Sequence, residues 1–129
     1  MLVLNGIDIV DVTEISRLLQ DPNSHFLNRC FRPEEIKNFS NQNQAAEHYA
    51  GVFAAKEAVT KALGTGFGNG VSFSDIEIRY LQSGQPTVVL HSNADKAARA
   101  KGIDTWSVSI SHTSRQAIAS AIALVIRSP

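Results

Sequence analysis

Two acidic side chains and one lysine are of the types that bind a metal ion together with phosphate. Asp8 lies in the otherwise apolar run from Gly6 to Val10, and because burying a bare carboxylate is costly, it needs a partner. Glu57 and Lys61 are four residues apart, so on a helix they share one face. Mg²⁺ binds to proteins through one or two carboxylates plus substrate phosphates. Asp8 and Glu57 are therefore candidate Mg²⁺ ligands, and Lys61 is a candidate phosphate-binding cation.

Each of these three residues also has an ordinary structural explanation. Asp8 would serve equally as a helix cap or as the acceptor of a structural hydrogen bond. Glu57 and Lys61 would form a common surface ion pair, which stabilises a helix by about 0.3 kcal/mol. Taken one residue at a time, the structural explanation is the more frequent one.

Two further segments have a composition suited to ligand binding. The run from Gly64 to Gly70 has a glycine at every second position. It would allow a nucleotide to approach the backbone, but it lacks the lysine and hydroxyl residue of a P-loop, so helix termination explains it better. Ser111, His112 and Thr113 end a predicted strand, where a histidine is either a structural group or a ligand contact. The other histidines have no zinc-binding spacing; they are His25, His48 and His91.

The bulk composition excludes several classes of protein. Lys plus Arg and Asp plus Glu both number 12 among 129 residues, so no global positive field favours nucleic acid. Hydrophobic residues make up 43% and lie in separate clusters, which indicates a soluble globular protein with no membrane-spanning bundle. We expect one domain over residues 1–129. Cys30 is the single cysteine, and the N-terminus lacks a secretory pattern, so we expect a reducing, cytoplasmic compartment.

Hydrophobic periodicity and turn residues predict the elements that must position these side chains. Strands are expected over residues 2–7, 73–80 with a break near Asp75, 87–90, 106–110 and 117–126. Helices are expected from Asp11 or Thr13 to about Asp21, from Pro33 to about Asn38, and over residues 45–63 and 93–101. Because the helices come early and hairpin-linked strands late, the order favours an α+β fold with a largely antiparallel sheet and a long central helix.

Four segments occur in a characteristic order along the chain. They are GIDIV at 6–10, FAAKEAVTKALGTG at 53–66, SFSDIEI at 72–78 with a Gly-x-Pro turn after it, and SISHT at 109–113. In this order they resemble the holo-[acyl-carrier-protein] synthases, of the 4′-phosphopantetheinyl transferase family. The second segment is highly specific, the first and last are loose, and the resemblance covers essentially the whole chain.

The resemblance implies an Mg²⁺-dependent enzyme of fatty-acid synthesis that transfers 4′-phosphopantetheine from coenzyme A to a serine of an apo-acyl-carrier protein, releasing adenosine 3′,5′-bisphosphate. Asp8 and Glu57 would bind Mg²⁺ and, with Lys61, form the catalytic set. Lys61 would also contact coenzyme A, as would Ser111, His112 and Thr113 near the nucleotide end. Glu57 or a metal-bound water would accept the serine proton. The alternative is a non-catalytic module of the same fold that binds coenzyme A or a nucleotide.

The resemblance also implies partners. Members of the family are homotrimers with the active site between subunits. The apolar strand face that includes Trp106, Val108 and Ile110 would serve either that packing or the core of one subunit. Acidic carrier proteins would dock on a basic strip, for which a solvated face is the alternative; its candidates are Arg17, Arg29, Arg32 and Lys37.

Two positions differ from the usual pattern of the family. Many members have an arginine, which offers a phosphate contact, where this chain has Val52. Coenzyme A would then be held by fewer charges or by a substitute. Glu14 stands where a basic residue often faces the carrier protein, which affects the expected choice of carrier. Neither change touches the carboxylates of Asp8 and Glu57.

Overall fold

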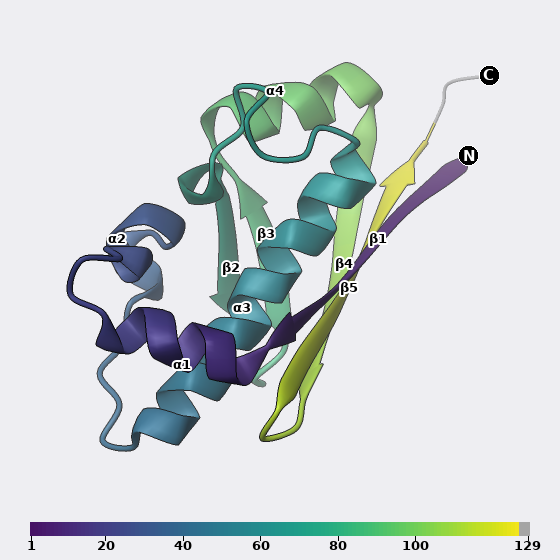
Figure 1. Cartoon of the computed structure of the whole chain (residues 1–129). Coiled ribbons are helices and arrows are strands. Elements are labelled where there is room, and N and C mark those ends of the chain that lie inside the picture. Colours follow the sequence, from purple (N-terminus) through teal and green to yellow (C-terminus); the bar gives the residue numbers. More distant parts are fainter. Residues whose placement is uncertain (127–129) are drawn as a thin grey trace.

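A long central helix packs against a three-stranded sheet and a smaller two-stranded sheet in the computed structural model, which describes residues 1–126 (Figure 1). The strands are β1 Leu2–Asp11, β2 Ile76–Tyr80, β3 Pro86–Leu90, β4 Ile103–His112 and β5 Gln116–Val125. The helices are α1 Val12–Gln20, α2 Phe26–Cys30, α3 Gln42–Leu63 and α4 Ser92–Lys101, with 3-10 turns at Pro33–Glu35 and Phe73–Asp75. The α+β prediction is confirmed, and all strand pairs are antiparallel.

The larger sheet has the strand order β1-β5-β4, so the first strand of the chain pairs with the last. This pairing runs from Leu2 opposite Val125 to Asp11 opposite Gln116. One face of β5 consists of small buried residues that alternate with outward-facing ones, as expected for a strand with one covered face. Those buried residues are Ala117, Ala119, Ala121, Ala123 and Val125. Their small size allows α3 to lie close to the sheet.

Helix α3 is the centre of the fold and contacts β1, β5, β4, β2 and α1. It begins three residues before the predicted start because the Asn41 side chain accepts hydrogen bonds from the backbone N–H groups of Asn43 and Gln44. It ends where Gly64 takes the left-handed conformation, with φ +79°. Within the described residues, none of the helices has both the length and the apolar character needed to cross a membrane.

Two of the predicted elements differ from the structure, and one helix of the structure was missed. The helix predicted from Pro33 to about Asn38 is only a 3-10 turn, because Glu35 turns its side chain into the core and Ile36 is extended. The five-residue α2 was not predicted at all. The first strand does not stop at Ile7 but continues to Asp11, because β5 pairs with its whole length. Asp8 therefore lies inside a strand and not at a strand-to-helix junction.

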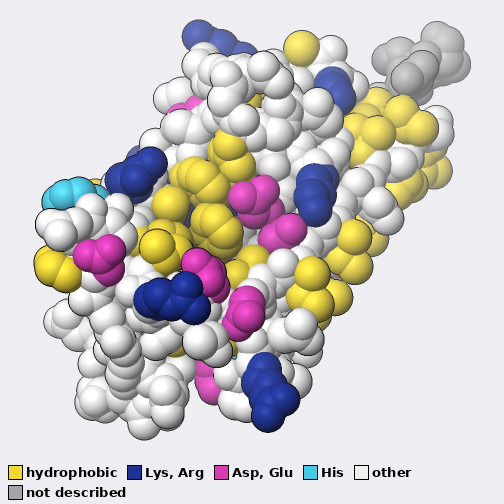
Figure 2. Space-filling model, in the orientation of Figure 1, with side chains coloured by type: hydrophobic (Ala, Val, Ile, Leu, Met, Phe, Trp, Pro, Cys, Tyr) yellow, Lys and Arg dark blue, Asp and Glu magenta, His cyan; other side chains and the backbone are white. Residues whose placement is uncertain are grey.

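The two faces of the larger sheet have different surroundings. Val108 belongs to the hydrophobic core, and Trp106 and Ile110 pack against that core, so the β4 face singled out from the sequence is the inner one. The outer face carries exposed aliphatic side chains, which are Val3, Ile7, Ile9, Ile118 and Ile122. Figure 2 shows hydrophobic side chains in a row along the edge of the molecule where β1 and β5 run. The outer face is thus an apolar surface that this chain does not cover.

Candidate active site

A close approach between β1 and α3 sets the position of Asp8. A Cβ atom added to Gly6 would overlap the Ala58 carbonyl oxygen and would come within 2.9 Å of both Ala62 N and Lys61 Cβ. Position 6 must therefore be a glycine if the strand is to touch the helix backbone. Asp8 is two residues further along the strand, so its side chain is on the same, inward face. Gly6 thus brings Asp8 to the last turns of α3.

Lys61 joins the strand to the helix at this point. Its Nζ donates a hydrogen bond to the Ile7 carbonyl oxygen at 2.9 Å and another to Asp8 Oδ1 at 3.2 Å. The Asp8 side chain is 17% exposed and that of Lys61 is 53% exposed, so the pair lies at the surface with its carboxylate recessed. The sequence suggested a helical pair of Lys61 with Glu57, whereas the structure pairs Lys61 with Asp8.

Glu57 completes a cluster of two carboxylates and one ammonium group. Burial and the nearby Asp8 carboxylate raise the pKa of Glu57, while Lys61 lowers it. Asp8 is therefore close enough to Glu57 for the two negative charges to repel, although they are 49 residues apart in the sequence (57 − 8). Such a cluster attracts a cation and, through Lys61, an anion next to it. Figure 2 shows acidic side chains beside Lys or Arg side chains in the region where α3 and β1 lie side by side.

Lys56 precedes Glu57 in the sequence but has a different role. Its side chain is fully buried, with Nζ at 2.6 Å from Glu35 Oε1 and hydrogen-bonded to the carbonyl oxygens of Cys30 and Phe73. Burial lowers the pKa of Lys56, and the Glu35 carboxylate opposes this shift. Glu35 in turn accepts a hydrogen bond from the backbone N–H of Ile78 at 2.9 Å. Lys56 therefore ties α3 to the 3-10 turn and to β2.

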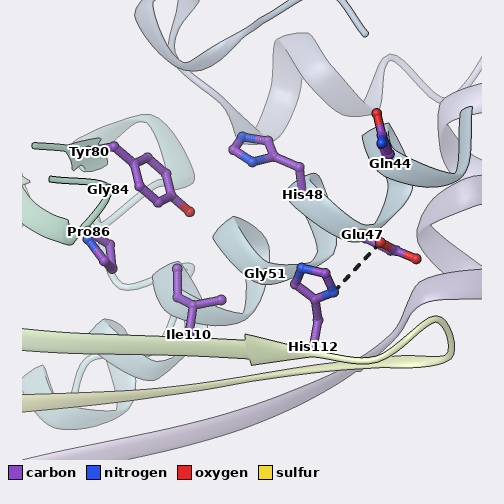
Figure 3. Close-up of a pocket in the computed structure, with 9 residues that line it drawn as sticks. All are labelled: Gln44, Glu47, His48, Gly51, Tyr80, Gly84, Pro86, Ile110 and His112. Atoms are coloured by element: carbon purple, nitrogen blue, oxygen red, sulfur yellow. Dashed lines mark ion pairs between the residues drawn. The ribbon is translucent and has the colours of Figure 1, made fainter. Parts of the chain in front are cut away.

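His112 lines a cavity of about 500 Å³ between the first half of α3, β4 and the β2–β3 hairpin (Figure 3). Its Nδ1 lies 3.7 Å from Glu47 Oε2. The other polar or aromatic side chains of the wall are Gln44, His48 and Tyr80. A volume of this size is typical of small-ligand sites. Glu47 and Glu57 are ten residues apart on α3, about 15 Å along the helix axis, so within one chain this cavity is distant from the Asp8 cluster.

Ser111 and Thr113, on either side of His112 in the sequence, do not line the cavity that His112 lines. Ser111 has the opposite orientation on β4, as strand alternation requires, and it lies with Ile7 and Ile118 on the outer face of the sheet. The Thr113 hydroxyl accepts hydrogen bonds from the backbone N–H groups of Arg115 and Gln116, both at 3.1 Å. The structure therefore brings only His112 of this trio into the cavity of its own chain.

The glycine-rich run after α3 acts first as a helix terminator. The N–H of Gly64 bonds to the carbonyl oxygens of Thr60 and Lys61, as at a typical helix C-terminus. The three later glycines also have positive φ. Added Cβ atoms on Gly66 and Gly68 would meet nothing within 4 Å, so no close packing explains these two within the described chain.

The basic residues expected to dock an acidic carrier protein do not form one uniform strip. Arg17 pairs with Glu14 at 3.2 Å, and both side chains are exposed. Arg32 is held by Glu34 and by the Ser74 carbonyl oxygen. The remaining two are exposed; they are Arg29 and Lys37.

Some residues of the site were not singled out from the sequence. Gln44, Glu47, His48 and Gly51 line the cavity at helical spacing i, i+3, i+4, i+7. A polar stripe at this spacing marks one helix face, and this signal would have found them. Gly6 carried no such signal, because its contact with α3 depends on residues more than 50 positions away.

Known proteins are similar to this chain over most of its length. Residues 5–120 match the family model described as ACPS, 4′-phosphopantetheinyl transferase superfamily. The chain is 44% identical over 119 residues to the holo-[acyl-carrier-protein] synthase of Thermoanaerobacter sp. strain X514, covering 92% of this chain and 85% of that protein.

Solved structures show the same similarity. The holo-[acyl-carrier-protein] synthase of Helicobacter pylori in complex with coenzyme A superposes with a TM-score of 0.79 at 34% identity, covering 94% of this chain and 100% of the other. The ACPS–CoA complex of Chronobacterium ammoniagenes gives 0.86 at 27% identity, covering 98% and 100%. On these grounds the chain belongs to the 4′-phosphopantetheinyl transferase superfamily, as an enzyme of the holo-[acyl-carrier-protein] synthase kind.

Proposed function

We propose that the chain transfers 4′-phosphopantetheine from coenzyme A to a serine of an apo-acyl-carrier protein, with Mg²⁺, releasing adenosine 3′,5′-bisphosphate in support of cytoplasmic fatty-acid synthesis. The observation that carries this proposal is the convergence of Asp8, Glu57 and Lys61 where β1 meets α3. Two carboxylates and a lysine suit a diphosphate held through a divalent cation. The coenzyme A complexes of similar proteins support the donor.

The two carboxylates fit a magnesium ion. In the described part of the chain, no group of three or more His, Cys, Asp or Glu side chains is arranged around one point. Mg²⁺ needs no such group, because it keeps several waters and takes substrate phosphates as ligands. Burial, followed by the charge of Asp8, raises the pKa of Glu57, and a divalent cation would relieve the repulsion between the two carboxylates. When bound, the ion would neutralise charge that develops on the departing diphosphate oxygen.

The residues of the cluster then have separate tasks. The carrier serine oxygen attacks the β-phosphorus of coenzyme A, and the bond from that phosphorus to the bridging oxygen breaks with its electron pair going to adenosine 3′,5′-bisphosphate. Lys61, held between Asp8 and the Ile7 carbonyl, places a positive charge beside the phosphates. Glu57, or a water held by the ion, would accept the serine proton.

The nucleotide end of coenzyme A is assigned to the cavity lined by His112. Within one chain that cavity and the Asp8 cluster are far apart, as the ten residues between Glu47 and Glu57 require. A donor that touches both would span about this distance within one chain or bridge two chains. We propose the second arrangement, a homotrimer in which the Asp8 cluster of one subunit faces the Ser111–Thr113 segment of the next.

The outer face of the β1-β5-β4 sheet supports association of this kind. Ile7, Ile9 and Ile122 are 57%, 58% and 43% exposed in the single chain. Contiguous exposed aliphatic side chains on one sheet face mark an interaction surface. For docking of the acidic carrier we propose Arg29 together with Arg17, although Glu14 offsets the charge of Arg17.

The deciding experiment incubates the purified protein with Mg²⁺, coenzyme A and several apo-carrier proteins, followed by mass spectrometry of the carriers. The expected gain is about 340 Da on the carrier, the mass of one phosphopantetheinyl group transferred by phosphoryl transfer. Unmodified carriers in every case, with coenzyme A still bound to the protein, would instead indicate a non-catalytic binding module.

A further inference from the structure

A second cavity of about 190 Å³ lies beside the one that contains His112. His48 and Tyr80 line both cavities, so the two cavities share a wall. Val52 lies in the lining of the smaller cavity, and so does Lys37. Val52, where the family resemblance led us to expect an arginine, therefore lines the same space as a lysine from a different part of the chain.

The carboxylates around the smaller cavity already have cationic partners. Their pairs are Glu34 with Arg32 at 3.2 Å, Glu35 with Lys56 at 2.6 Å and Glu77 with Arg79 at 3.0 Å. Glu77 is also 2.9 Å from His91 Nε2. Lys37, by contrast, forms no ion pair with any carboxylate in the described part of the chain. Among the charged side chains that line the smaller cavity in residues 1–126, Lys37 is therefore the one without an oppositely charged partner.

The position of Lys37 is fixed by its main chain. The backbone N–H of Lys37 donates to the Tyr49 hydroxyl, and that hydroxyl donates to the Lys37 carbonyl oxygen, each at 3.0 Å. Tyr49 is buried in α3, so it anchors this loop to the helix. The Nζ atom lies 5.4 Å from the centre of the Tyr80 ring. A cation over an aromatic ring keeps N–H groups that can still bind an anion.

A phosphate group bound in the larger cavity would need a cation from outside the wall of that cavity. No Lys or Arg belongs to its lining within residues 1–126, and the imidazole of His112 faces the Glu47 carboxylate. Burial, followed by the charges of Lys37 and His112, lowers the pKa of His48 to about 4, so His48 is neutral at pH 7. Because Lys37 contributes to the lowered pKa of His48, the charge of Lys37 acts on a residue that lines both cavities.

We propose that Lys37 recognises the 3′-phosphate on the ribose of coenzyme A and thereby sets the preference for coenzyme A over dephospho-coenzyme A. This inference rests on the proposed function, which assigns the nucleotide end of the donor to the larger cavity. A phosphate group there needs a charge-assisted partner. The flexible stem of Lys37 brings an ammonium group to the shared wall, in the space that Val52 leaves without an arginine.

The test is direct binding, because binding does not depend on turnover. Isothermal titration calorimetry with coenzyme A and with dephospho-coenzyme A is carried out on the full chain and on Lys37→Gln, Lys37→Arg and Lys37→Gln/Val52→Arg. Lys96→Gln on α4, which also removes one exposed positive charge, is the matched control. Glutamine keeps the backbone bonds to Tyr49, and circular dichroism verifies the fold of each variant.

The unmodified chain should bind coenzyme A about tenfold more tightly than dephospho-coenzyme A. Lys37→Gln should abolish this ratio by weakening the binding of coenzyme A alone, whereas Lys37→Arg and Lys96→Gln should keep it. Val52→Arg should restore the ratio in the Lys37→Gln background. A ratio that survives Lys37→Gln, or that Val52→Arg fails to restore, overturns the proposal.

Transfer to apo-carriers is measured in parallel with the binding experiment. If no carrier is modified while the binding ratio still depends on Lys37, the proposed function fails and this inference stands. If the carrier is modified and Lys37→Gln raises only the KM for the carrier, Lys37 docks the carrier and the inference fails.

Discussion

The Lys56 ammonium group lies 2.6 Å from Glu35 Oε1 in the core, with both side chains almost completely buried. The next residue, Glu57, belongs to the surface cluster with Asp8 and Lys61. Two consecutive charged residues of one helix thus serve different purposes, since neighbours on a helix lie about 100° apart. The most specific segment of the sequence therefore supplies both a residue of the proposed catalytic cluster and a structural residue.

Lys56→Met should lower the free energy of unfolding by about 3–5 kcal/mol, because it leaves the buried Glu35 carboxylate without its cation. Urea denaturation measures the change. Adding Glu35→Gln to this variant should recover part of the loss, since the buried charge is removed and an amide can still accept a hydrogen bond from Ile78 N. A loss below about 1 kcal/mol for Lys56→Met would contradict the assignment of a structural pair.

Glu57→Gln should reduce kcat by about 100-fold or more while leaving the fold intact, because it keeps the side-chain volume and removes one of two negative charges at the cluster. Asp8→Asn should act in the same direction. Carrier modification followed by mass spectrometry gives the rates. Asp95→Asn on α4 removes a charge from a surface pair with Arg99 and should leave the rate unaltered. Full activity of Glu57→Gln would exclude Glu57 as ligand or base.

Gly6→Ala should destabilise the chain by about 3 kcal/mol, because the added methyl group meets backbone atoms of α3 that cannot move aside. Activity should fall as well, since Asp8 shifts with the strand. Gly51→Ala is the comparison variant. Its Cβ would meet a single side-chain atom, Ile110 Cγ2, at 2.8 Å, and no backbone atom of another element. Thermal unfolding should rank Gly6→Ala as the more destabilised variant, and the reverse order would refute the close β1–α3 contact.

Ile122→Lys should convert the proposed homotrimer to a smaller species, because Ile122 lies on the central strand of the exposed apolar face. Light scattering coupled to size-exclusion chromatography measures the mass. Leu81→Lys alters an equally exposed side chain, 50% accessible, next to the β2–β3 turn, and should keep the mass of the unmodified chain. An unchanged mass for Ile122→Lys would argue against assembly through this face.

The lowered pKa of His48 makes the folded state sensitive to acid. Burial holds this pKa at about 4, below the ordinary value of 6.5, so between these values the unfolded chain binds more protons than the folded one. Stability therefore falls as the pH is lowered from 6.5 toward 4. In urea titrations at pH 7.0, 5.5 and 4.5, about the range of this shift, His48→Gln should show a shallower decline. If the unmodified chain and His48→Gln lose stability equally over these pH values, the pKa of His48 is not lowered.

The sequence by itself determined the α+β class, the central helix and the family, because these depend on local composition, periodicity and the order of short segments. It also determined the residue types of the cluster, since Asp8, Glu57 and Lys61 stand in those segments. The end of the central helix at Gly64 is likewise local, because its hydrogen bonds join residues a few positions apart.

Only the tertiary structure decided which of these residues meet. Lys61 pairs with Asp8, which is 53 positions away in the sequence. Lys56 is buried and pairs with Glu35, which is 21 positions away. It also decided that His112 enters a cavity whereas Ser111 faces outward, and that the apolar face of β4 belongs to the core. The physical reason is that burial, charge coupling and backbone contact depend on distances through space, which local patterns in a sequence do not contain.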